Sequence, residues 1–441
     1  MIVPSNREQK HKFILSGGGT GGHIFPAIAI ANALKNRFPD SEFLFVGALG
    51  KMEMEKVPKE GFEIVGLPIE GLRRSASPRN LLLIIKTLYS FVLARKILKK
   101  FKPSAVIGTG GYASLPICFM ATMAKIPTIL QEQNGYAGLS NRILANKASM
   151  ICTGFPDMQT FFTKGNWLFT GNPVRENIRA IGLITNPFLE TEKRTDTAMG
   201  SSTIDSGKQN EVTEIVDDAQ KALMQEEKVS AIKKKAIAVA GARSKFGLDP
   251  NLPVLFVTGG SLGAFSINEA LFANMVFLAE SGIQLIWQMG QAYAKSHTQA
   301  IAEIIENQAT LFVHKTSSHI FYAPFIVEMD QAYLAADIVI SRAGALSIAE
   351  IAVVGIPAIF VPSPNVTDDH QTKNAMELVN RHAALCVSDD AAAEQLIATA
   401  ISLLKDSEKQ SSIKHALLRI AKPLATQTIA TIIEECLKKK V

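Results

Sequence analysis

The sequence has few cysteines and no recognisable set of metal ligands. Its four cysteines, Cys118, Cys152, Cys386 and Cys436, are widely separated and include no Cys-x-x-Cys pair. This spacing excludes a disulfide framework and favours a reducing compartment. The sequence also contains no Asp-x-Asp motif and no His/Cys cluster, so a metal site has no obvious ligands. We therefore expect no metal and no other cofactor.

Long apolar runs are also missing. The longest charge-free stretch, Pro103–Ala124, is interrupted by three glycines and by Pro116, so it cannot form one continuous helix across a bilayer. The residues up to Lys12 are mostly polar and do not resemble a signal peptide. With 47% apolar and 20% charged residues, the 441-residue chain has the composition of a folded protein of two or three domains. We expect a soluble or peripheral protein.

Acidic residues are absent between Gly71 and Gln131. The same stretch contains ten basic residues: Arg73, Arg74, Arg79, Lys86, Arg95, Lys96, Lys99, Lys100, Lys102 and Lys125. Because the whole chain has a net charge of +6, the other residues together carry 6 − 10 = −4. Aliphatic residues lie between the basic ones, which favours an anionic membrane surface over nucleic acid as the partner. Part of this apolar set would belong to the core in any case.

Short apolar runs that end in glycine alternate with helical patterns, as in βα units around a parallel sheet. In the first half we predict strands at Lys12–Ser16, Glu42–Val46, Ala105–Gly108 and Thr128–Gln131, and helices at Pro26–Arg37 and Arg79–Lys100. In the second half we predict strands at Val254–Thr258, Gln284–Gln288, Ile338–Ser341 and Ala358–Val361, and helices at Ser266–Glu280 and Ser347–Val354. The pattern predicts an α/β protein with two Rossmann-like lobes that face a cleft, and ligands at the carboxyl ends of the strands.

The first glycine-rich segment, Gly17–His23, matches the pattern Gly-x-Gly-x-x-Gly. Such a loop lets a phosphate or sugar approach the backbone and the start of the next helix. The second strand ends Phe45-Val46-Gly47-Ala48, without the acid that usually binds the ribose of NAD, so we favour another phosphate or sugar ligand. His23 follows the glycines directly. It could pack under the helix, but the open glycine loop favours a base or hydrogen-bond donor at the site.

A second candidate site follows the strand at Ile338–Ser341. In the segment Ser341–Glu350, small residues open a helix whose first amides could bind a diphosphate. Glu350 could accept hydrogen bonds from both hydroxyls of a ribose, or could merely complement the helix dipole. The glycine loop at Gly259–Gly263 favours the nucleotide, and Arg175 could help to neutralise a diphosphate.

Seven motifs carry a resemblance to a known family. They are GGGTGGHIFPAIAIA at Gly17–Ala31, GTGGYAS at Gly108–Ser114, QEQN at Gln131–Asn134, GNPVR at Gly171–Arg175, GGSLGA at Gly259–Ala264, SRAGALSIAE at Ser341–Glu350 and DHQTKNA at Asp369–Ala375. In this order they resemble the MurG family of bacterial glycosyltransferases. The resemblance implies a GT-B fold and inverting transfer of N-acetylglucosamine from UDP to the C4 hydroxyl of lipid I, giving lipid II. It also implies metal-independent donor binding, a role in peptidoglycan synthesis, cell shape and division, and a peripheral place on the cytoplasmic face of the inner membrane.

The resemblance also implies particular site residues. Those for UDP-N-acetylglucosamine are Thr20, Gly21, Gly22, Asn134, Arg175, Ser261, Ile326, Ala345, Leu346, Ser347, Ile348, Ala349, Glu350 and Gln371. Those for the lipid I pyrophosphate are Gly18, Gly19, Gly110, Gly111 and Tyr112. His23 is our choice for the base that assists the acceptor hydroxyl, and Glu132 is the alternative.

We expect residues 1–175 to form the first lobe and residues 251–420 the second. Residues 176–250 would form a linker with an insertion at about 190–245, which departs from the family but interrupts no motif. Residues 421–441 would form a helix that returns to the first lobe. Two other functions fit the same fold: a UDP-N-acetylglucosamine epimerase and a non-catalytic, membrane-bound nucleotide-sugar sensor. The acid-free basic stretch and the QEQN motif disfavour the epimerase, and the full set of sugar and phosphate contacts disfavours the sensor.

Overall fold

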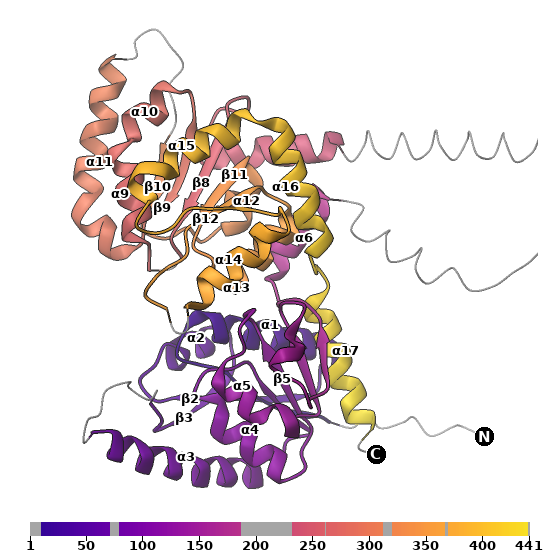
Figure 1. Ribbon diagram of the computed structural model, residues 1–441. Coiled ribbons are helices and arrows are strands. Elements are labelled where there is room, and N and C mark those ends of the chain that lie inside the picture. The colour runs from indigo at the N-terminus through magenta and orange to yellow at the C-terminus, as the bar shows by residue number, and fades with distance from the viewer. Residues whose placement is uncertain are drawn as a thin grey trace, which may run out of the picture. The chain divides into compact units, whose positions relative to one another are not determined.

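The structure is a computed structural model that describes residues 10–70, 79–186, 232–260, 262–311, 320–366 and 369–439. The chain divides into two compact units. The first consists of residues 1–175, 344–349 and 422–441, and the second of residues 176–343 and 350–421. Each unit has one β-sheet in which all paired strands run parallel (Figure 1).

The first sheet has seven strands in the order β3-β2-β1-β4-β5-β6-β7. Their bounds are β1 Lys12–Ser16, β2 Glu42–Ala48, β3 Glu63–Leu67, β4 Ala105–Gly108, β5 Thr128–Glu132, β6 Met150–Thr153 and β7 Trp167–Phe169. The central strands are apolar at successive positions because both faces of the sheet are covered. In β1, Phe13 and Leu15 belong to one buried cluster, whereas Ile14 belongs to the cluster on the other face.

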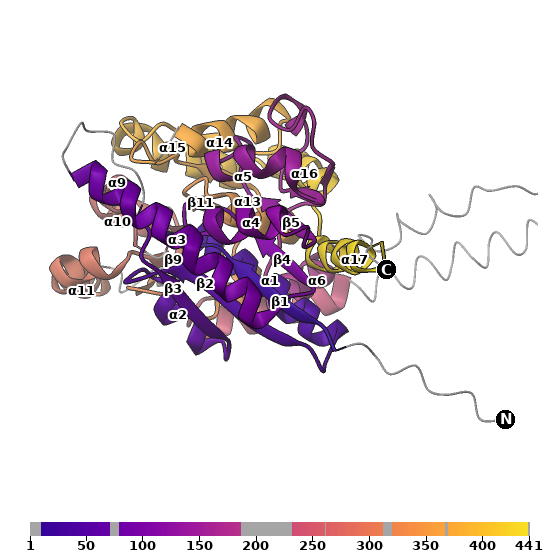
Figure 2. The same ribbon diagram turned by 90° about the horizontal axis from the view of Figure 1, so that it is seen from below.

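Helices cover both faces of the first sheet. Side chains of α1 (Gly21–Arg37), α2 (Glu53–Lys59) and α17 (Ala425–Lys438) pack in the cluster that contains Phe13. Side chains of α3 (Arg79–Phe101), α4 (Ser114–Met123) and α5 (Leu139–Leu144) pack in the cluster that contains Ile14, and α3 and α4 lie in front of the strands in Figure 2. Residues Ala145–Lys147 and Met158–Thr160 form short 3₁₀ turns.

The last helix of the chain, α17, packs on this first unit. Its apolar side chains Ile429 and Ile433 are fully buried against the sheet. At its outer edge, Arg37 of α1 donates a hydrogen bond to the Thr431 hydroxyl (3.0 Å) and forms an ion pair with Glu434. The C-terminal residues therefore complete the core of the unit that the N-terminal residues begin.

The second sheet has six strands in the order β10-β9-β8-β11-β12-β13. Their bounds are β8 Val254–Thr258, β9 Gln284–Gln288, β10 Ile320–Ala323, β11 Ile338–Ser341, β12 Ala358–Phe360 and β13 Leu385–Cys386. The helices in this part of the chain are α6 Glu176–Thr185, α9 Phe265–Ala273, α10 Met275–Glu280, α11 Gln291–Leu311, α12 Met329–Ala335, α13 Ala345–Val354, α14 His370–Asn380, α15 Ala392–Lys405 and α16 Ser407–Ile420. Residues 232–245 are also helical.

The structure changes two of the predicted helices. Helix α1 begins at Gly21 instead of Pro26, so Gly21 and Gly22 lie in its first turn and the loop itself ends at Thr20. The predicted helix Ser266–Glu280 is two helices that break at Asn274. The Asn274 side chain donates to the carbonyl of Ala270 (2.8 Å), and such local bonding by Asn competes with helix continuation.

Both sheets reverse their strand order at one point, between β1 and β4 in the first and between β8 and β11 in the second. Open parallel sheets bind ligands beyond the carboxyl ends of the strands at such a point. The loops that follow these four strands contain the glycine-rich motifs singled out from the sequence. The topology therefore places one candidate site on each sheet.

Candidate functional site

In the first unit, the glycine loop lies between β1 and α1. Gly19 has a φ of +90°, a conformation that glycine adopts without strain, and a Cβ there would lie 3.2 Å from the Tyr112 ring. Tyr112 belongs to the loop after β4. Burial raises the pKa of Tyr112, and the carboxylates of Glu53 and Glu70 raise it further. The structure thus brings together the loops after β1 and β4, which carry all five residues predicted for the acceptor.

His23 lies in the first turn of α1 and is half-buried. Its Nδ1 is 3.3 Å from the Thr20 hydroxyl, and its backbone carbonyl accepts a hydrogen bond from the Thr109 hydroxyl (2.7 Å). The loop after β4 lies against the ring, since a Cβ on Gly110 would be 3.0 Å from His23 Cδ2. The imidazole therefore lies between the loops after β1 and β4.

Glu132, the alternative base, is the last residue of β5 and is only 2% exposed. One carboxylate oxygen accepts a hydrogen bond from the amide of Asn134 (3.1 Å), and the other accepts bonds from the amide of Gly138 and the side chain of Asn141 (both 2.9 Å). Burial raises the pKa of Glu132, and these hydrogen bonds oppose that rise. The carboxylate holds the loop that follows β5, which includes the half-buried Asn134.

A buried amide network surrounds Glu132, and the residues that form it were not among the predicted site residues. The Gln131 side chain donates to the side chain of Asn172 (2.9 Å), whose own amide donates to the carbonyl of Gln133 (2.9 Å). The Gln133 side chain donates to the carbonyl of Thr109 in the loop after β4 (2.7 Å). The network therefore ties the loops after β4 and β5 to the GNPVR motif. The QEQN and GNPVR motifs were each recognised in the sequence, but only the fold shows that their side chains are hydrogen-bonded to each other.

In the second unit, Gln288 at the end of β9 organises the loop after β8. Its side chain donates to the Thr258 hydroxyl and to the carbonyl of Gly260 (both 3.0 Å), and it accepts a hydrogen bond from the amide of Ile326 (2.8 Å). A base recognised at Ile326 would consequently use the carbonyl of that residue. Ser261, predicted to contact the donor, lies outside the described residues.

The segment after β11 is held by Arg342, another residue absent from the predicted set. Its guanidinium donates to the carbonyls of Val361 and Pro362 (both 3.1 Å) and pairs with Asp389. Helix α13 then begins at Ala345, so the amides of its first turn have no partner within the helix. Glu350 is 8% exposed in the second turn of this helix.

The other donor residues occupy separate places. Gln371 lies in the first turn of α14 and accepts a hydrogen bond from the amide of Ser363 (2.9 Å). Arg175 is exposed and is the last residue of the segment 1–175, which belongs to the first unit. Among the predicted donor contacts, Thr20, Gly21, Gly22, Asn134, Arg175 and the α13 residues Ala345, Leu346, Ser347, Ile348 and Ala349 belong to the first unit, and Ile326, Glu350 and Gln371 to the second. Within the described ranges, no group of three or more His, Cys, Asp or Glu side chains could hold a metal ion.

Two parallel sheets with glycine loops at their reversal points define the fold class as GT-B. The sequence pattern of the glycosyltransferase family 28 N-terminal domain matches residues 13–153, and that of the C-terminal domain matches residues 254–429. The chain belongs to glycosyltransferase family 28. The predicted fold class and the family resemblance are thereby confirmed.

Individual relatives agree over almost the whole chain. A protein of Cytophaga hutchinsonii is 41% identical over 97% of this chain and 98% of its own length. A protein of Porphyromonas gingivalis is 41% identical over 95% of this chain and 94% of its own length. Both are named UDP-N-acetylglucosamine--N-acetylmuramyl-(pentapeptide) pyrophosphoryl-undecaprenol N-acetylglucosamine transferase. The crystal structure of Acinetobacter baumannii MurG superposes with a TM-score of 0.64 at 25% identity, covering 97% of this chain and all of that one.

Proposed function

We propose that this chain transfers N-acetylglucosamine from UDP-N-acetylglucosamine to the C4 hydroxyl of the N-acetylmuramoyl unit of lipid I, giving lipid II for peptidoglycan synthesis. The observation that carries the proposal is the 41% identity over nearly full length to relatives named for this transfer. The two loop sets described above support it, because each presents backbone amides at a sheet reversal where phosphates and sugars bind.

The reaction is an inverting displacement at the anomeric carbon. The acceptor C4 oxygen forms a bond to that carbon, the bond from the carbon to the UDP oxygen breaks, and the hydroxyl proton passes to a base on the protein. His23 is the base in this proposal, since its half-buried ring lies between the two loops assigned to the acceptor. Glu132 instead positions the loop after β5, because both its oxygens already accept hydrogen bonds from that loop and from Asn141.

The donor is assigned mainly to the segment around α13. The amides at the start of α13 stabilise the diphosphate, where negative charge develops as UDP leaves. Glu350 accepts hydrogen bonds from the ribose hydroxyls, and the carbonyl of Ile326 recognises the base. Gln371 contacts the sugar hydroxyls from the first turn of α14.

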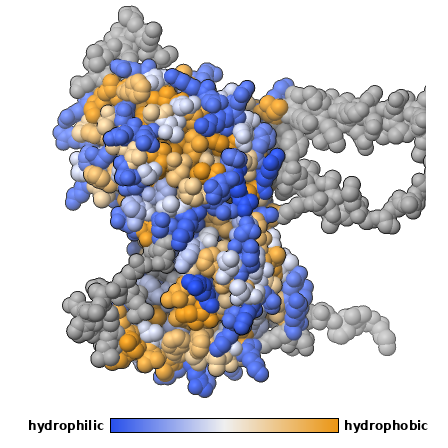
Figure 3. All heavy atoms as spheres, in the orientation of Figure 1, coloured by the Kyte–Doolittle hydropathy of each residue, from blue (hydrophilic) through white to orange (hydrophobic). Residues whose placement is uncertain are grey.

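The first unit also offers a surface for the membrane that carries the acceptor. On α3, the large apolar side chains of Ile84, Ile85, Leu88, Tyr89 and Val92 are each more than half exposed. Lys96, Lys99 and Lys100 are exposed on the same helix one to four turns later. Figure 3 shows hydrophobic residues gathered on the part of the first unit where α3 and α4 run in Figure 1. Among the described residues, no helix is both long and apolar enough to cross a bilayer.

A helix face that combines exposed aliphatic and basic residues suits the interface of an anionic membrane. We therefore assign the chain to the cytoplasmic face of the bacterial inner membrane, as a peripheral protein docked through α3. Met123 of α4 and Leu139 of α5 are also more than half exposed, and both helices pack against the same face of the sheet as α3. The docking surface thus extends beyond α3 itself.

One assay separates this function from its two rivals. The protein is incubated with UDP-N-acetylglucosamine labelled in the sugar, with and without lipid I, and the products are separated. Label that moves into a lipid product only when lipid I is present supports the transferase. Label that appears in a different UDP-sugar without lipid I indicates the epimerase, and label that stays in bound, unchanged donor indicates a sensor; either result contradicts the proposal.

A further inference from the structure

One buried carboxylate beside the acceptor loops has no role in the reaction described above. Glu53 is the first residue of α2 and is 0% exposed. One of its carboxylate oxygens accepts a hydrogen bond from the amide of Gly19 (3.1 Å), and the other accepts one from the amide of Ala48 (2.9 Å). A single side chain therefore joins the loop after β1 to the end of β2, at the carboxyl edge of the sheet.

Two glycines leave the space that this carboxylate occupies. A Cβ on Gly18 would lie 2.1 Å from Glu53 Oε1, and a Cβ on Gly47 would lie 2.5 Å from Glu53 Cγ. Both distances are far shorter than any tolerated contact, so each glycine is needed for Glu53 to sit where it does. The position of Glu53 therefore explains why residue 18 is glycine even when no ligand is bound. It also explains why residue 47, near the end of β2, has no side chain.

Thr20 connects the residue held by Glu53, Gly19, to the proposed base, His23. Gly19 precedes Thr20, whose hydroxyl lies 3.3 Å from His23 Nδ1 and whose carbonyl accepts a hydrogen bond from the His23 amide (3.1 Å). The Tyr112 ring lies close to Gly19, since a Cβ on Gly19 would be 3.2 Å from it. A shift of Gly19 would therefore move the loop, Thr20 and the orientation of the imidazole together.

We propose that Glu53 is a positioning residue for the transfer reaction: through its bonds to Gly19 and Ala48 it fixes the glycine loop that holds the acceptor and orients His23. This inference rests on the proposed function, since it assigns the loop to the acceptor. Glu53 touches neither substrate. Its carboxylate suits two facing N–H donors because both of its oxygens accept. A carboxamide would turn its own N–H toward one of them.

The test uses the full-length protein with Glu53→Gln and a matched control, Val57→Ala. Val57 lies on the same short helix and is also buried, but it makes neither of the two hydrogen bonds. In Glu53→Gln we expect kcat/KM for lipid I to fall roughly ten- to hundredfold, as a small misplacement of reacting groups typically causes. UDP affinity by calorimetry should fall much less than kcat/KM for lipid I, because the diphosphate, ribose and base are assigned to the start of α13, to Glu350 and to Ile326. Val57→Ala should retain wild-type kinetics for both substrates.

Hydrogen–deuterium exchange gives a readout that needs no activity. The amides of residues 17–22 should exchange faster in Glu53→Gln than in either the wild type or Val57→Ala. If Glu53→Gln fails to fold, Gly47→Ala displaces the same carboxylate from the β2 side and should produce the same loop exchange and the same loss on lipid I. Loop exchange and acceptor kinetics equal to those of Val57→Ala would overturn the inference. A wild-type protein without transferase activity would instead refute the proposed function.

Discussion

At the scale of single residues, the two candidate bases differ in what their side chains already do. Glu132 is enclosed by the loop that it organises, with hydrogen bonds to Asn134, Gly138 and Asn141. The Thr20 hydroxyl lies 3.3 Å from His23 Nδ1, and Gly110 and Gly111 of the loop after β4 lie beside the ring. A base must reach the acceptor hydroxyl, and a ring flanked by glycines allows this approach better than an enclosed carboxylate does.

This difference predicts how activity depends on pH. If neutral His23 accepts the proton, kcat/KM for lipid I should fall on the acidic side of the pH profile, because the protonated ring cannot act as a base. His23→Gln should lower kcat by a factor of about 10²–10⁴ and abolish that acidic limb. Glu132→Gln, the comparison variant, should keep the limb even if its loop loosens and turnover falls. A His23→Gln enzyme with the wild-type pH profile would exclude His23 as the base.

Several residues that organise the sites could not have been found from the sequence. Glu53, Gln288 and Arg342 bind groups that lie 19 or more residues away in the chain, such as Gly19, Ile326 and Val361. The neighbouring sequence does not distinguish these residues from others of their type. Glu53 resembles any acidic residue in the first turn of a helix, and Gln288 resembles any polar residue at the end of a strand. The glycines and His23 could be predicted because a Gly-rich turn between a strand and a helix is itself a local signal.

At the scale of elements, the central strands of both sheets were predicted better than the strands near the sheet edges and better than several helices. Buried parallel strands are short apolar runs that end at glycines, and their signal is contained in four or five residues. The structure places β1, β4, β8, β9 and β11 at the predicted residues, but β3, β6, β7, β10 and β13, which lie at or next to the sheet edges, were not predicted. Helices such as α2, α6 and α14 were not predicted, because each is short or polar and is stabilised by packing that the sequence does not reveal. The Asn274 break between α9 and α10 depends on one side-chain hydrogen bond.

The element with the clearest functional consequence is α3. Each basic residue near an anionic surface contributes roughly 1 kcal/mol at most, and the effect fades within a Debye length. Changing Lys96, Lys99 and Lys100 to Gln should therefore weaken flotation with anionic vesicles and lower turnover of the full-length lipid acceptor. Turnover of a short-chain, water-soluble acceptor should remain, because none of the three side chains is buried.

The matched control removes the same charge elsewhere. Lys295, Lys405 and Lys409 are exposed on helices of the second unit, and changing all three to Gln should leave flotation unaltered. Equal losses on both acceptors in the α3 variant would point to damage of the acceptor site. Vesicle binding that is indifferent to the α3 change and to high salt would contradict electrostatic docking.

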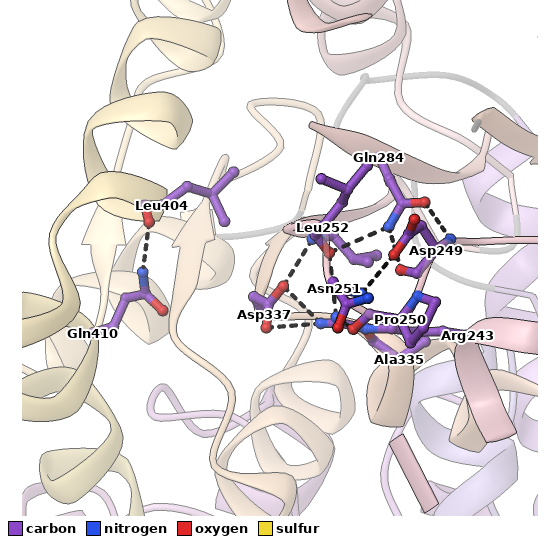
Figure 4. Close-up of polar contacts among 11 residues, drawn as sticks. Arg243, Asp249, Pro250, Asn251, Leu252, Gln284, Ala335, Asp337, Leu404 and Gln410 are labelled. Carbon is purple, nitrogen blue, oxygen red and sulfur yellow. Dashed lines mark hydrogen bonds and ion pairs between the residues drawn. The ribbon is translucent and has the colours of Figure 1, made fainter. Parts of the chain in front are cut away.

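At the scale of the whole molecule, the insertion predicted at about 190–245 has a boundary that its sequence did not reveal. Residues 190–231 lie outside the described residues, but residues 232–245 form a helix that ends in a buried anchor (Figure 4). The Arg243 guanidinium donates to the carbonyls of Ala335, Pro250 and Leu252, and to both carboxylate oxygens of Asp337 (2.8 and 2.9 Å). Asp337 also accepts a hydrogen bond from the amide of Val254 (2.7 Å), so this anchor fixes the amino ends of β8 and β11.

Two replacements should consequently behave very differently. A Gly/Ser linker in place of residues 190–231 removes sequence that lies between intact motifs, so UDP affinity and turnover should stay within about a few-fold of wild type, changes well under 1.4 kcal/mol. Arg243→Met in the full-length chain should destabilise the second unit by roughly 1–3 kcal/mol, because it leaves three backbone carbonyls and the partly exposed Asp337 without their partner. Thermal unfolding and UDP calorimetry measure both effects. A folded but inactive linker variant would show that the insertion takes part in catalysis. An unchanged melting temperature in Arg243→Met would show that the helix at 232–245 is not needed to stabilise the second sheet. The insertion would then end near residue 245, as the sequence predicted.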